Sequence, residues 1–302
     1  MSQARGKVSP LKLRASLHAT IWGGRNLATV ARKSLPPDVD VGESWETEVG
    51  NVVENGAYAG MTLGQVVMEL DQALLGTRAI ELFGHRFPLL AKFIDARENL
   101  SVQVHPNDAQ AQEFAPGKLG KTEAWYILRA EPAAKLVLGF QRAVSEEEVR
   151  RAVGEHRLED LLHTFAVHSG DVVFVPSGTV HAIGGGVVLY ELQEYSDITY
   201  RLYDYGRRQR DGQPRELHVQ QALQVMKFEP LGSESVRPVP LRTQDEGVQR
   251  RILVACQYFA LEEIIFSGSM VTTTASSSCE ILSILDGPCS VVATKGTPLA
   301  LE

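Results

Sequence analysis

The stretch Val172–His181, VVFVPSGTVH, decides the fold that this sequence predicts. It begins as a run of β-branched and aromatic residues, which is typical of a buried strand. Pro176 and Gly178 then predict a tight turn, because proline fixes φ and glycine tolerates positive φ. After three glycines a second apolar run follows, Val187–Leu192. His181 therefore lies at the edge of a turn between two strands, where its side chain can face a cavity.

A histidine beside a turn is more often a hydrogen-bonded structural residue than a ligand, but a second stretch strengthens the ligand interpretation. In Ser101–Asp108, SVQVHPND, Gln103 and His105 project from the same side of a strand, since strand side chains alternate. A carboxylate, Glu123, follows in GKTEAWYI. Imidazole nitrogens, a carboxylate and an amide can close a four-ligand site for a divalent metal such as zinc. The candidate metal ligands are Gln103, His105, Glu123 and His181.

The composition is that of an ordinary globular protein. The chain has 302 residues, of which 44% are hydrophobic and 22% charged, enough for one large domain or two moderate ones. The net charge of -7 argues against a nucleic-acid surface, although it allows a local basic pocket for one phosphate group. Apolar runs fall well short of the roughly 20 residues that a membrane span needs. We therefore expect no nucleic-acid partner and no membrane segment.

The N-terminal residues and the cysteines indicate a cytoplasmic protein. Leu11–Arg14 alternates as a strand does, and no continuous apolar core of a signal peptide follows it. The three cysteines, Cys256, Cys279 and Cys289, are sparse and have no Cys-x-x-Cys spacing, which favours reduced thiols.

The remaining patterns predict a mainly β chain with a few helices. Capping boxes at Thr62 and Ser145 open two helices, the first with apolar periodicity through Leu74, and Leu158–Phe165 continues in helical style. Ser233–Asp245 is rich in proline and polar residues and is interpreted as a linker. Strands are expected for a small antiparallel β unit at Arg251–Val254, Phe259–Phe266, Cys279–Leu285 and Ser290–Thr294.

Two charged residues lie within predicted strands. Lys92 interrupts the apolar strand Phe87–Ala96, where it either faces solvent on the alternating face or binds an anion in a cavity. Alternation over Ile198–Tyr205 places Arg201 on one face with two hydroxyl residues. That face suits an anionic ligand, and the alternative is a solvated edge strand with an Arg–carboxylate pair.

In the predicted hairpin between Val172 and Leu192, the sequence resembles the second motif of the cupin superfamily. The glycine, proline and glycine before His181 have the cupin spacing, although Gly185 stands where asparagine is usual. The first cupin motif is half present, with Gln103-x-His105 in place of His-x-His. The altered set resembles the type I mannose-6-phosphate isomerases in their short bacterial form. The matching segments are Gly42–Glu46, Leu100–Asp108, Gly120–Tyr126, Pro176–Ala182 and Glu191–Arg207.

This resemblance implies a cupin-type β-sandwich or jelly-roll barrel with inserted helices. The implied domains are a catalytic cupin domain at 1–230 and a smaller cupin-like β unit at 231–302, which we expect to be incomplete. One zinc ion is implied at Gln103, His105, Glu123 and His181. The implied catalytic residues are Arg201, Lys121 and Glu191.

The implied reaction interconverts mannose 6-phosphate and fructose 6-phosphate through an enediol(ate). Arg201 cannot act as a base at neutral pH, so it serves the developing oxyanion or the phosphate. Glu191 and Lys121 are both candidate proton carriers. The partner is a sugar phosphate, and we expect a monomer or weak homo-oligomer. Two alternatives remain, a non-catalytic cupin that binds or senses a sugar phosphate and a metal-dependent cupin oxygenase, although oxygenases usually have more histidine ligands.

Overall fold

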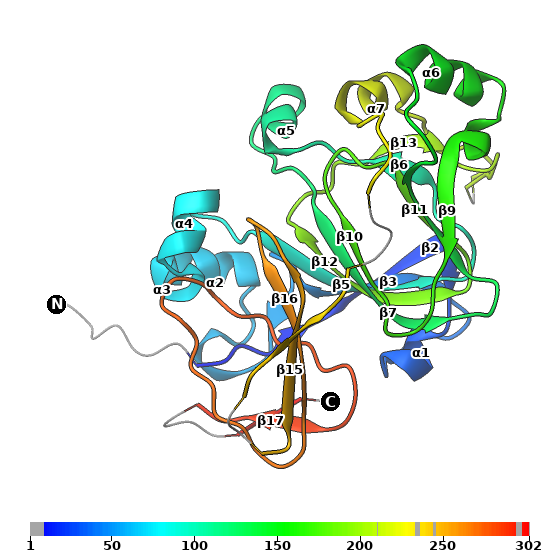
Figure 1. Cartoon of the computed structure of the whole chain (residues 1–302). Coiled ribbons are helices and arrows are strands. Elements are labelled where there is room, and N and C mark those ends of the chain that lie inside the picture. The colour runs from blue at the N-terminus through cyan, green and yellow to red at the C-terminus, as the bar shows by residue number, and fades with distance from the viewer. Residues whose placement is uncertain (1–8, 210, 233–235, 244–245, 294–297, 302) are drawn as a thin grey trace. The chain divides into compact units, whose positions relative to one another are not determined.

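The computed structural model describes residues 9–209, 211–232, 236–243, 246–293 and 298–301 (Figure 1). The chain divides into two compact units. Unit 1 contains Met1–Ser16, Trp45–Leu90 and Val271–Glu302, and unit 2 contains Leu17–Ser44 and Ala91–Met270. These compact units have other boundaries than the catalytic domain at 1–230 and the β unit at 231–302 that we expected from the sequence. That functional division stays a prediction.

Two β-sheets make up most of unit 2. The larger has six strands, which in spatial order are β10 (Val172–Val175), β7 (Glu123–Ala130), β12 (Val187–Glu194), β5 (Leu89–Ala96), β3 (Val41–Thr47) and β2 (Ser16–Gly24). The smaller has five strands, β13 (Tyr200–Tyr203), β6 (Val102–Val104), β11 (His181–Ile183), β8 (Lys135–Phe140) and β9 (Leu162–Ala166). The non-sequential strand order means that each sheet is assembled from segments far apart in the chain.

One hydrophobic core joins the inner faces of these two sheets. Trp125 and Ile127 of β7 and Leu189 of β12 come from the six-stranded sheet, whereas Leu136 and Leu138 of β8 come from the five-stranded sheet. All five are almost fully buried. Two sheets that share one core form a sandwich, which confirms the mainly β fold expected from the sequence.

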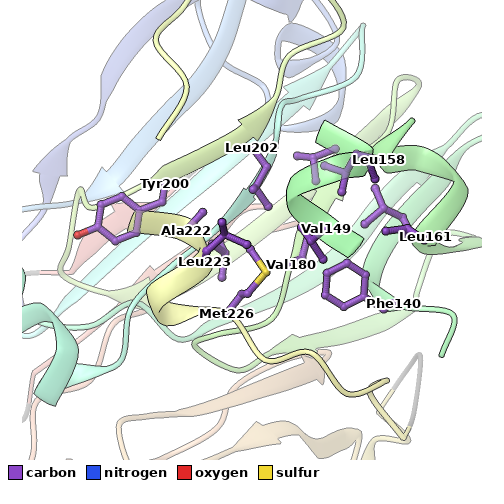
Figure 2. Packing of buried hydrophobic residues seen from close by; sticks show 14 of the residues in the cluster. Phe140, Val149, Leu158, Leu161, Val180, Tyr200, Leu202, Ala222, Leu223 and Met226 are labelled. Carbon is purple, nitrogen blue, oxygen red and sulfur yellow. The ribbon is translucent and has the colours of Figure 1, made fainter. Parts of the chain in front are cut away.

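A second core covers the outer face of the five-stranded sheet. Val102, Val104 and Leu202 alternate with the inward-facing residues of their strands and belong to this cluster. Figure 2 shows Leu202 beside residues of the covering helices. Phe140 and Met226 belong to the same cluster. The helices and the 3-10 turn of unit 2 are α1 (Leu27–Val30), α5 (Asp108–Phe114), α6 (Glu146–Gly154), η2 (Leu158–Leu161) and α7 (Val219–Val225). Because apolar side chains cover this outer face, the polar residues of the same strands point into the sandwich.

The remaining sheet of unit 2 is a three-stranded meander of β14 (Val239–Leu241), β15 (Val248–Ala255) and β16 (Ala260–Phe266). The strands expected at Arg251–Val254 and Phe259–Phe266 are thereby confirmed. Within the linker predicted at Ser233–Asp245, residues 233–235 and 244–245 lie outside the described residues. Three of its other residues form β14 instead of a linker, because they pair with β15.

Unit 1 contains two small sheets and short helices. Its elements are β1 (Leu13–Arg14), β4 (Val52–Val53), η1 (Gly56–Tyr58), α2 (Leu63–Leu70), α3 (Gln72–Leu75), α4 (Thr77–Phe83), β17 (Cys289–Val291) and β18 (Leu299–Leu301). The strand expected at Cys279–Leu285 is wrong, since these residues form no strand. β17 overlaps the strand expected at Ser290–Thr294, whose last residue lies outside the described residues.

The predicted helix starts are confirmed, whereas two helical stretches are shorter than expected. Thr62 and Gln65 form a reciprocal capping box at α2, and the Ser145 side chain caps α6. The first stretch is interrupted at Asp71, whose φ of 47° ends α2 before Leu74. The helical expectation for Leu158–Phe165 holds for its first half, the 3-10 helix η2, and is wrong for its second half, which pairs with β8 as strand β9. In the part of the chain that the structure describes, we find no helix long and apolar enough to cross a membrane.

Candidate active site

A row of polar side chains crosses the inner face of the five-stranded sheet. Gln103 on β6 lies opposite both His181 on β11 and Arg201 on β13, and residues directly opposite one another share a face. His105 follows at the end of β6. The predicted turn holds its backbone, because Gly178, with φ 83°, donates its N–H to the His105 carbonyl at 2.8 Å. The turn and β6 thus place both histidines on one side of the sandwich.

Glu123 reaches the two histidines from the opposite sheet. It is the first residue of β7 and pairs with Val175 and Gln193 on the neighbouring strands. Glu123 Oε1 is 3.3 Å from His105 Nε2, and Oε2 is 3.5 Å from His181 Nε2. All three side chains are about 1% exposed, and their ligand atoms lie within 4.8 Å of one another. Among the described residues, this is the cluster of histidine and carboxylate groups that can hold a metal ion.

Backbone carbonyls fix the orientation of both imidazoles. His105 Nδ1 donates to Ile198 O at 2.7 Å, and His181 Nδ1 donates to Thr179 O at 2.8 Å. Each Nε2 therefore presents its lone pair toward Glu123, as metal-binding histidines do. Burial, and then the Lys121 charge, lower the pKa of His105 to about 3, and burial also lowers the pKa of His181. Both rings are thus neutral and able to coordinate a cation.

The separations of these atoms fit a tetrahedral metal ion. Ligands about 2.1 Å from such an ion lie about 3.4 Å apart, close to the two histidine–glutamate separations. Glu123 Oε2 is buried and has no hydrogen-bond partner, so it retains an unused acceptor. Burial raises the pKa of Glu123, but Lys121 and the histidines outweigh burial and lower it well below its usual value. The carboxylate is therefore ionised, and the three groups fit a divalent metal.

Gln103 completes a fourth corner of this cluster. Its Nε2 is 3.4 Å from His181 Nε2, and its Oε1 accepts a hydrogen bond from Ser101 Oγ at 3.3 Å. A half-turn of the terminal amide exchanges these two atoms and brings the oxygen, which can bind a metal, toward the histidines. The structure thus brings together all four ligands predicted from the sequence.

Lys121 lies against the same cluster. Its Nζ is 2.7 Å from Glu123 Oε1 and 3.3 Å from His105 Nε2. The residue before it, Gly120, passes so close to the neighbouring chain that a Cβ there would lie 2.6 Å from the carbonyl carbon of Asn107. Only glycine fits this approach without displacement, so the glycine of the GKTE motif places the lysine that follows it.

Glu191 lies on β12, one alternation from Gln193, and meets Lys92 of β5. Lys92 Nζ is 3.3 Å from Glu191 Oε1 and 3.6 Å from Glu43 Oε1. Lys92 is only 7% exposed. Of the two orientations that the sequence allowed, its side chain therefore points into the protein and not toward solvent. Burial opposes the charge of Lys92, but Glu191 and Glu43 outweigh burial and raise its pKa. Burial and the Glu123 charge raise the pKa of Glu191 to about 7.

Arg201 is held at the edge of the polar row by two hydrogen bonds. Its Nε donates to Ser101 Oγ at 3.1 Å, and its Nη1 donates to Glu216 O at 2.9 Å. Through Ser101, the guanidinium is linked to Gln103 and hence to His181. Burial, and then the charge of Arg215, lower the pKa of Arg201. Arg215 and Arg207 both bind the single carboxylate of Asp204, so cations exceed anions in this group.

Sequence reasoning missed several contributors to this site. Ser101, which joins Arg201 to Gln103, carried no signal beyond its place in the strand. The apolar run around Lys92 was a signal, but it could not decide which way the lysine faced. The carbonyl groups of Ile198 and Thr179 gave no signal, because any residue supplies a backbone carbonyl. Nothing in the sequence indicated which arginines bind Asp204, and only the contacts in the structure identify them.

Comparison with known proteins identifies the family. Residues 11–128 match the family described as phosphomannose isomerase type I, catalytic domain. The chain is 36% identical over 269 residues to a mannose-6-phosphate isomerase of Streptococcus mutans and 39% identical over 264 residues to the mannose-6-phosphate isomerase ManA of Bacillus subtilis. Each match covers 86% of this chain and 80% of the relative.

A solved structure supports the same assignment. The crystal structure of the mannose 6-phosphate isomerase from Bacillus subtilis matches with a TM-score of 0.75 and 33% identity, over 86% of this chain and 81% of that one. Similarity of sequence and of fold over most of both chains agrees with the buried His–Glu–His cluster and its lysine. This chain therefore belongs to the mannose-6-phosphate isomerase family, type I, with a cupin fold.

Proposed function

We propose that this chain is an isomerase that interconverts mannose 6-phosphate and fructose 6-phosphate. The names of its relatives support the substrate and the reaction. The structural observation that carries the proposal is the buried cluster of His105, Glu123 and His181 with Lys121 against it. Such a site suits an aldose–ketose isomerase, because the enzyme must stabilise an enediol(ate) and move protons away from bulk water.

The metal that we propose is zinc, one ion per chain, held by His105, Glu123, His181 and Gln103. The donor set supports this choice, since imidazole nitrogen and carboxylate oxygen are usual zinc ligands in sites that remain open to a substrate or water. When bound, zinc supplies positive charge that polarises the sugar carbonyl or orients the sugar oxygens. The carbonyl groups of Ile198 and Thr179 keep both imidazoles in the ligating tautomer.

The reaction is a proton transfer with no net change of atoms or oxidation state. A base removes the proton from C2, the electron pair forms the C1–C2 double bond, and the C1 carbonyl oxygen takes up a proton. The O2 hydroxyl then loses its proton, the C2 carbonyl forms, and C1 receives a proton. The chain must therefore provide a group that accepts and returns protons near C1 and C2, and a cation near the oxygen atoms.

Glu191 is the proton carrier that we favour. Its pKa of about 7 lies close to the working pH, where a general base is most effective, and Lys92 fixes its carboxylate on the inner face of the sheet. Lys121 is the other candidate, with its Nζ held by Glu123 at 2.7 Å. With Glu191 as the base, Lys121 places its charge beside the developing oxyanion.

Arg201 binds the anionic part of the substrate in this proposal, either the phosphate or the oxyanion. Its guanidinium is fixed by Ser101 Oγ and the Glu216 carbonyl. The charges of two arginines, Arg207 and Arg215, and two carboxylates, Asp204 and Glu216, act on it. The remaining positive charge favours a doubly charged phosphate. A cytoplasmic location and a monomeric or weakly oligomeric state stay predictions.

A coupled assay tests the proposal directly. Conversion of mannose 6-phosphate to fructose 6-phosphate is measured before chelation, after removal of metal with a strong chelator, and after addition of zinc. We expect chelation to abolish turnover and zinc to restore it. No turnover in a folded sample that contains one zinc ion per chain would contradict the isomerase function and favour a binding protein.

A further inference from the structure

Two acidic residues outside the metal cluster, Asp108 and Glu194, hold the segment that carries Lys121 and Glu123. Glu194, the last residue of β12, is fully buried, with 0% of its surface exposed. Its Oε2 accepts a hydrogen bond from Thr122 N at 2.9 Å, and its own N–H donates to Thr122 O at 3.1 Å. Glu194 thus holds from two directions the residue between Lys121 and Glu123.

Asp108 holds the same segment two residues earlier. Its Oδ1 accepts a hydrogen bond from Gly120 N at 2.8 Å, at the point where Gly120 passes closest to the Asn107–Asp108 backbone. The other oxygen of the Glu194 carboxyl, Oε1, is buried and has no hydrogen-bond partner among the described residues, and the charge of Asp108 acts on Glu194. The two acids therefore form one clamp on the backbone of Gly120–Thr122.

This clamp favours one shared proton for its two carboxyl groups. Two neighbouring carboxylates repel when both are ionised, and a buried carboxylate with an unused oxygen is costly, so protonation of one of them stabilises the pair. Asp108 is half-buried and accepts from Gly120 N, whereas Glu194 is fully buried and its Oε1 has no partner among the described residues, which places the proton on Glu194. Burial, and then the Asp108 charge, raise the pKa of Glu194 to about 7. The other titratable groups that act with Glu194 are Tyr258 and Cys256, both of which burial keeps neutral by raising their pKa.

We propose that Glu194 is a positioning residue for the isomerase. In its protonated form it holds Thr122 while Asp108 holds Gly120, so that Lys121 and Glu123 keep their places in the site. This rests on the proposed function. When Glu194 loses its proton, two carboxylates face each other and repel, and the clamp weakens. The enzyme therefore loses turnover as the pH rises, although Glu194 itself does not contact the metal ligands or the substrate.

The conservative variant Glu194→Gln tests the shared proton. A glutamine keeps the shape of a protonated glutamate and accepts from Thr122 N at Oε1, but it cannot ionise. We expect the wild-type kcat to fall about threefold to tenfold between about pH 7 and about pH 8.5, and E194Q to lack this fall. Glu194→Ala removes the clamp and lowers kcat across the whole pH range with a smaller effect on KM. Glu113→Gln, at an exposed position of α5, is the matched control and should behave as the wild type.

A second measurement does not depend on activity. The folded pKa of Glu194 lies above the unfolded value, so its stabilising contribution is complete below about pH 4.5 and is lost as the pH rises to about 7. The Tm of E194Q relative to the wild type should therefore rise over this interval and level off above it. A pH-independent difference in both Tm and kcat would overturn the shared proton, and E194A with wild-type kcat would overturn the positioning role. A wild-type protein without isomerase activity would instead contradict the proposed function, while the Tm comparison would still test the shared proton.

Discussion

Gln103 and His181 lie directly opposite each other on β6 and β11, and their side-chain nitrogens are 3.4 Å apart. On the other side of β6, Arg201 occupies the corresponding position of β13. The register of these three strands thus places the candidate metal ligands Gln103 and His181 and the guanidinium of Arg201 in one row. A slip of one residue would turn these side chains toward the apolar cluster under the helices, so the site and the fold depend on the same pairing.

Replacing His181 with alanine should remove metal and activity together. The variant loses one buried nitrogen ligand whose orientation Thr179 fixes, and no neighbouring group replaces it. We expect kcat to fall by more than about 100-fold, since even the loss of a residue that only orients a ligand costs about 10- to 100-fold. Zinc per chain after dialysis and turnover are measured on the same sample. His168→Ala, at an exposed histidine, should retain both. Full zinc content in H181A would contradict the role of His181 as a ligand.

Replacing Arg201 with alanine should separate catalysis from metal binding. The guanidinium contacts Ser101 and Glu216 but none of the three clustered ligands. We expect kcat to fall by about 100- to 1000-fold, as for the loss of one charged or polar group that stabilises a transition state, with zinc content unchanged. Arg201→Lys should recover only part of the loss, because lysine lacks the two-pronged donor. Wild-type turnover in R201A would exclude a catalytic role, and Arg142→Ala, at an exposed arginine, is the control.

The pH dependence of kcat should identify the proton carrier. If ionised Glu191 is the base, activity rises as the pH increases through about 7, where this carboxyl loses its proton. Lys92 favours the ionised form, so Lys92→Met should raise the pKa of Glu191 and move the rising limb to higher pH by about one unit or more. Lys135→Met, at an exposed lysine, should leave the limb in place. An unchanged limb in K92M would instead favour Lys121 as the base.

A single methyl group at Gly120 should damage the site through the backbone. The added Cβ would lie 2.6 Å from the carbonyl carbon of Asn107, so either Gly120 or the start of α5 must move. Because Lys121 and Glu123 follow directly, we expect Gly120→Ala to lose at least about tenfold in kcat. At Gly154, nothing lies within 4 Å of the equivalent Cβ, so Gly154→Ala should be close to wild type. Equal turnover in both variants would show that the close approach at Gly120 is not needed.

Much of this site could be predicted because its residues lie in strands with a clear period. Alternation placed Gln103 and His105 on one side, and the proline and glycine before His181 predicted the turn that now holds the His105 carbonyl. The capping box at Thr62 and the side-chain cap at Ser145 likewise mark helix starts, since side chain and backbone meet within one turn of chain. In each case the deciding interaction lies within a few residues along the sequence.

The errors arose where pairing with distant segments decided the structure. Leu158–Phe165 has the apolar content of a helix, but β8 draws its second half into a sheet. Three residues of the predicted linker become β14 because β15 lies alongside them. Helical or loop preference contributes only fractions of a kcal/mol per residue, and strand pairing with burial exceeds it.

The sequence by itself determined which chemical groups are available: two histidines, a glutamate and a glutamine at strand ends, with a lysine, a glutamate and an arginine as candidate catalytic residues. Only the tertiary structure decided that Lys92 lies inside between Glu43 and Glu191 and that carbonyl groups orient both imidazoles. It also decided that Asp108 and Glu194 hold the backbone of Gly120 and Thr122. The physical reason is that charge and orientation at this site are set by burial and by partners up to about a hundred residues away, which no local pattern contains.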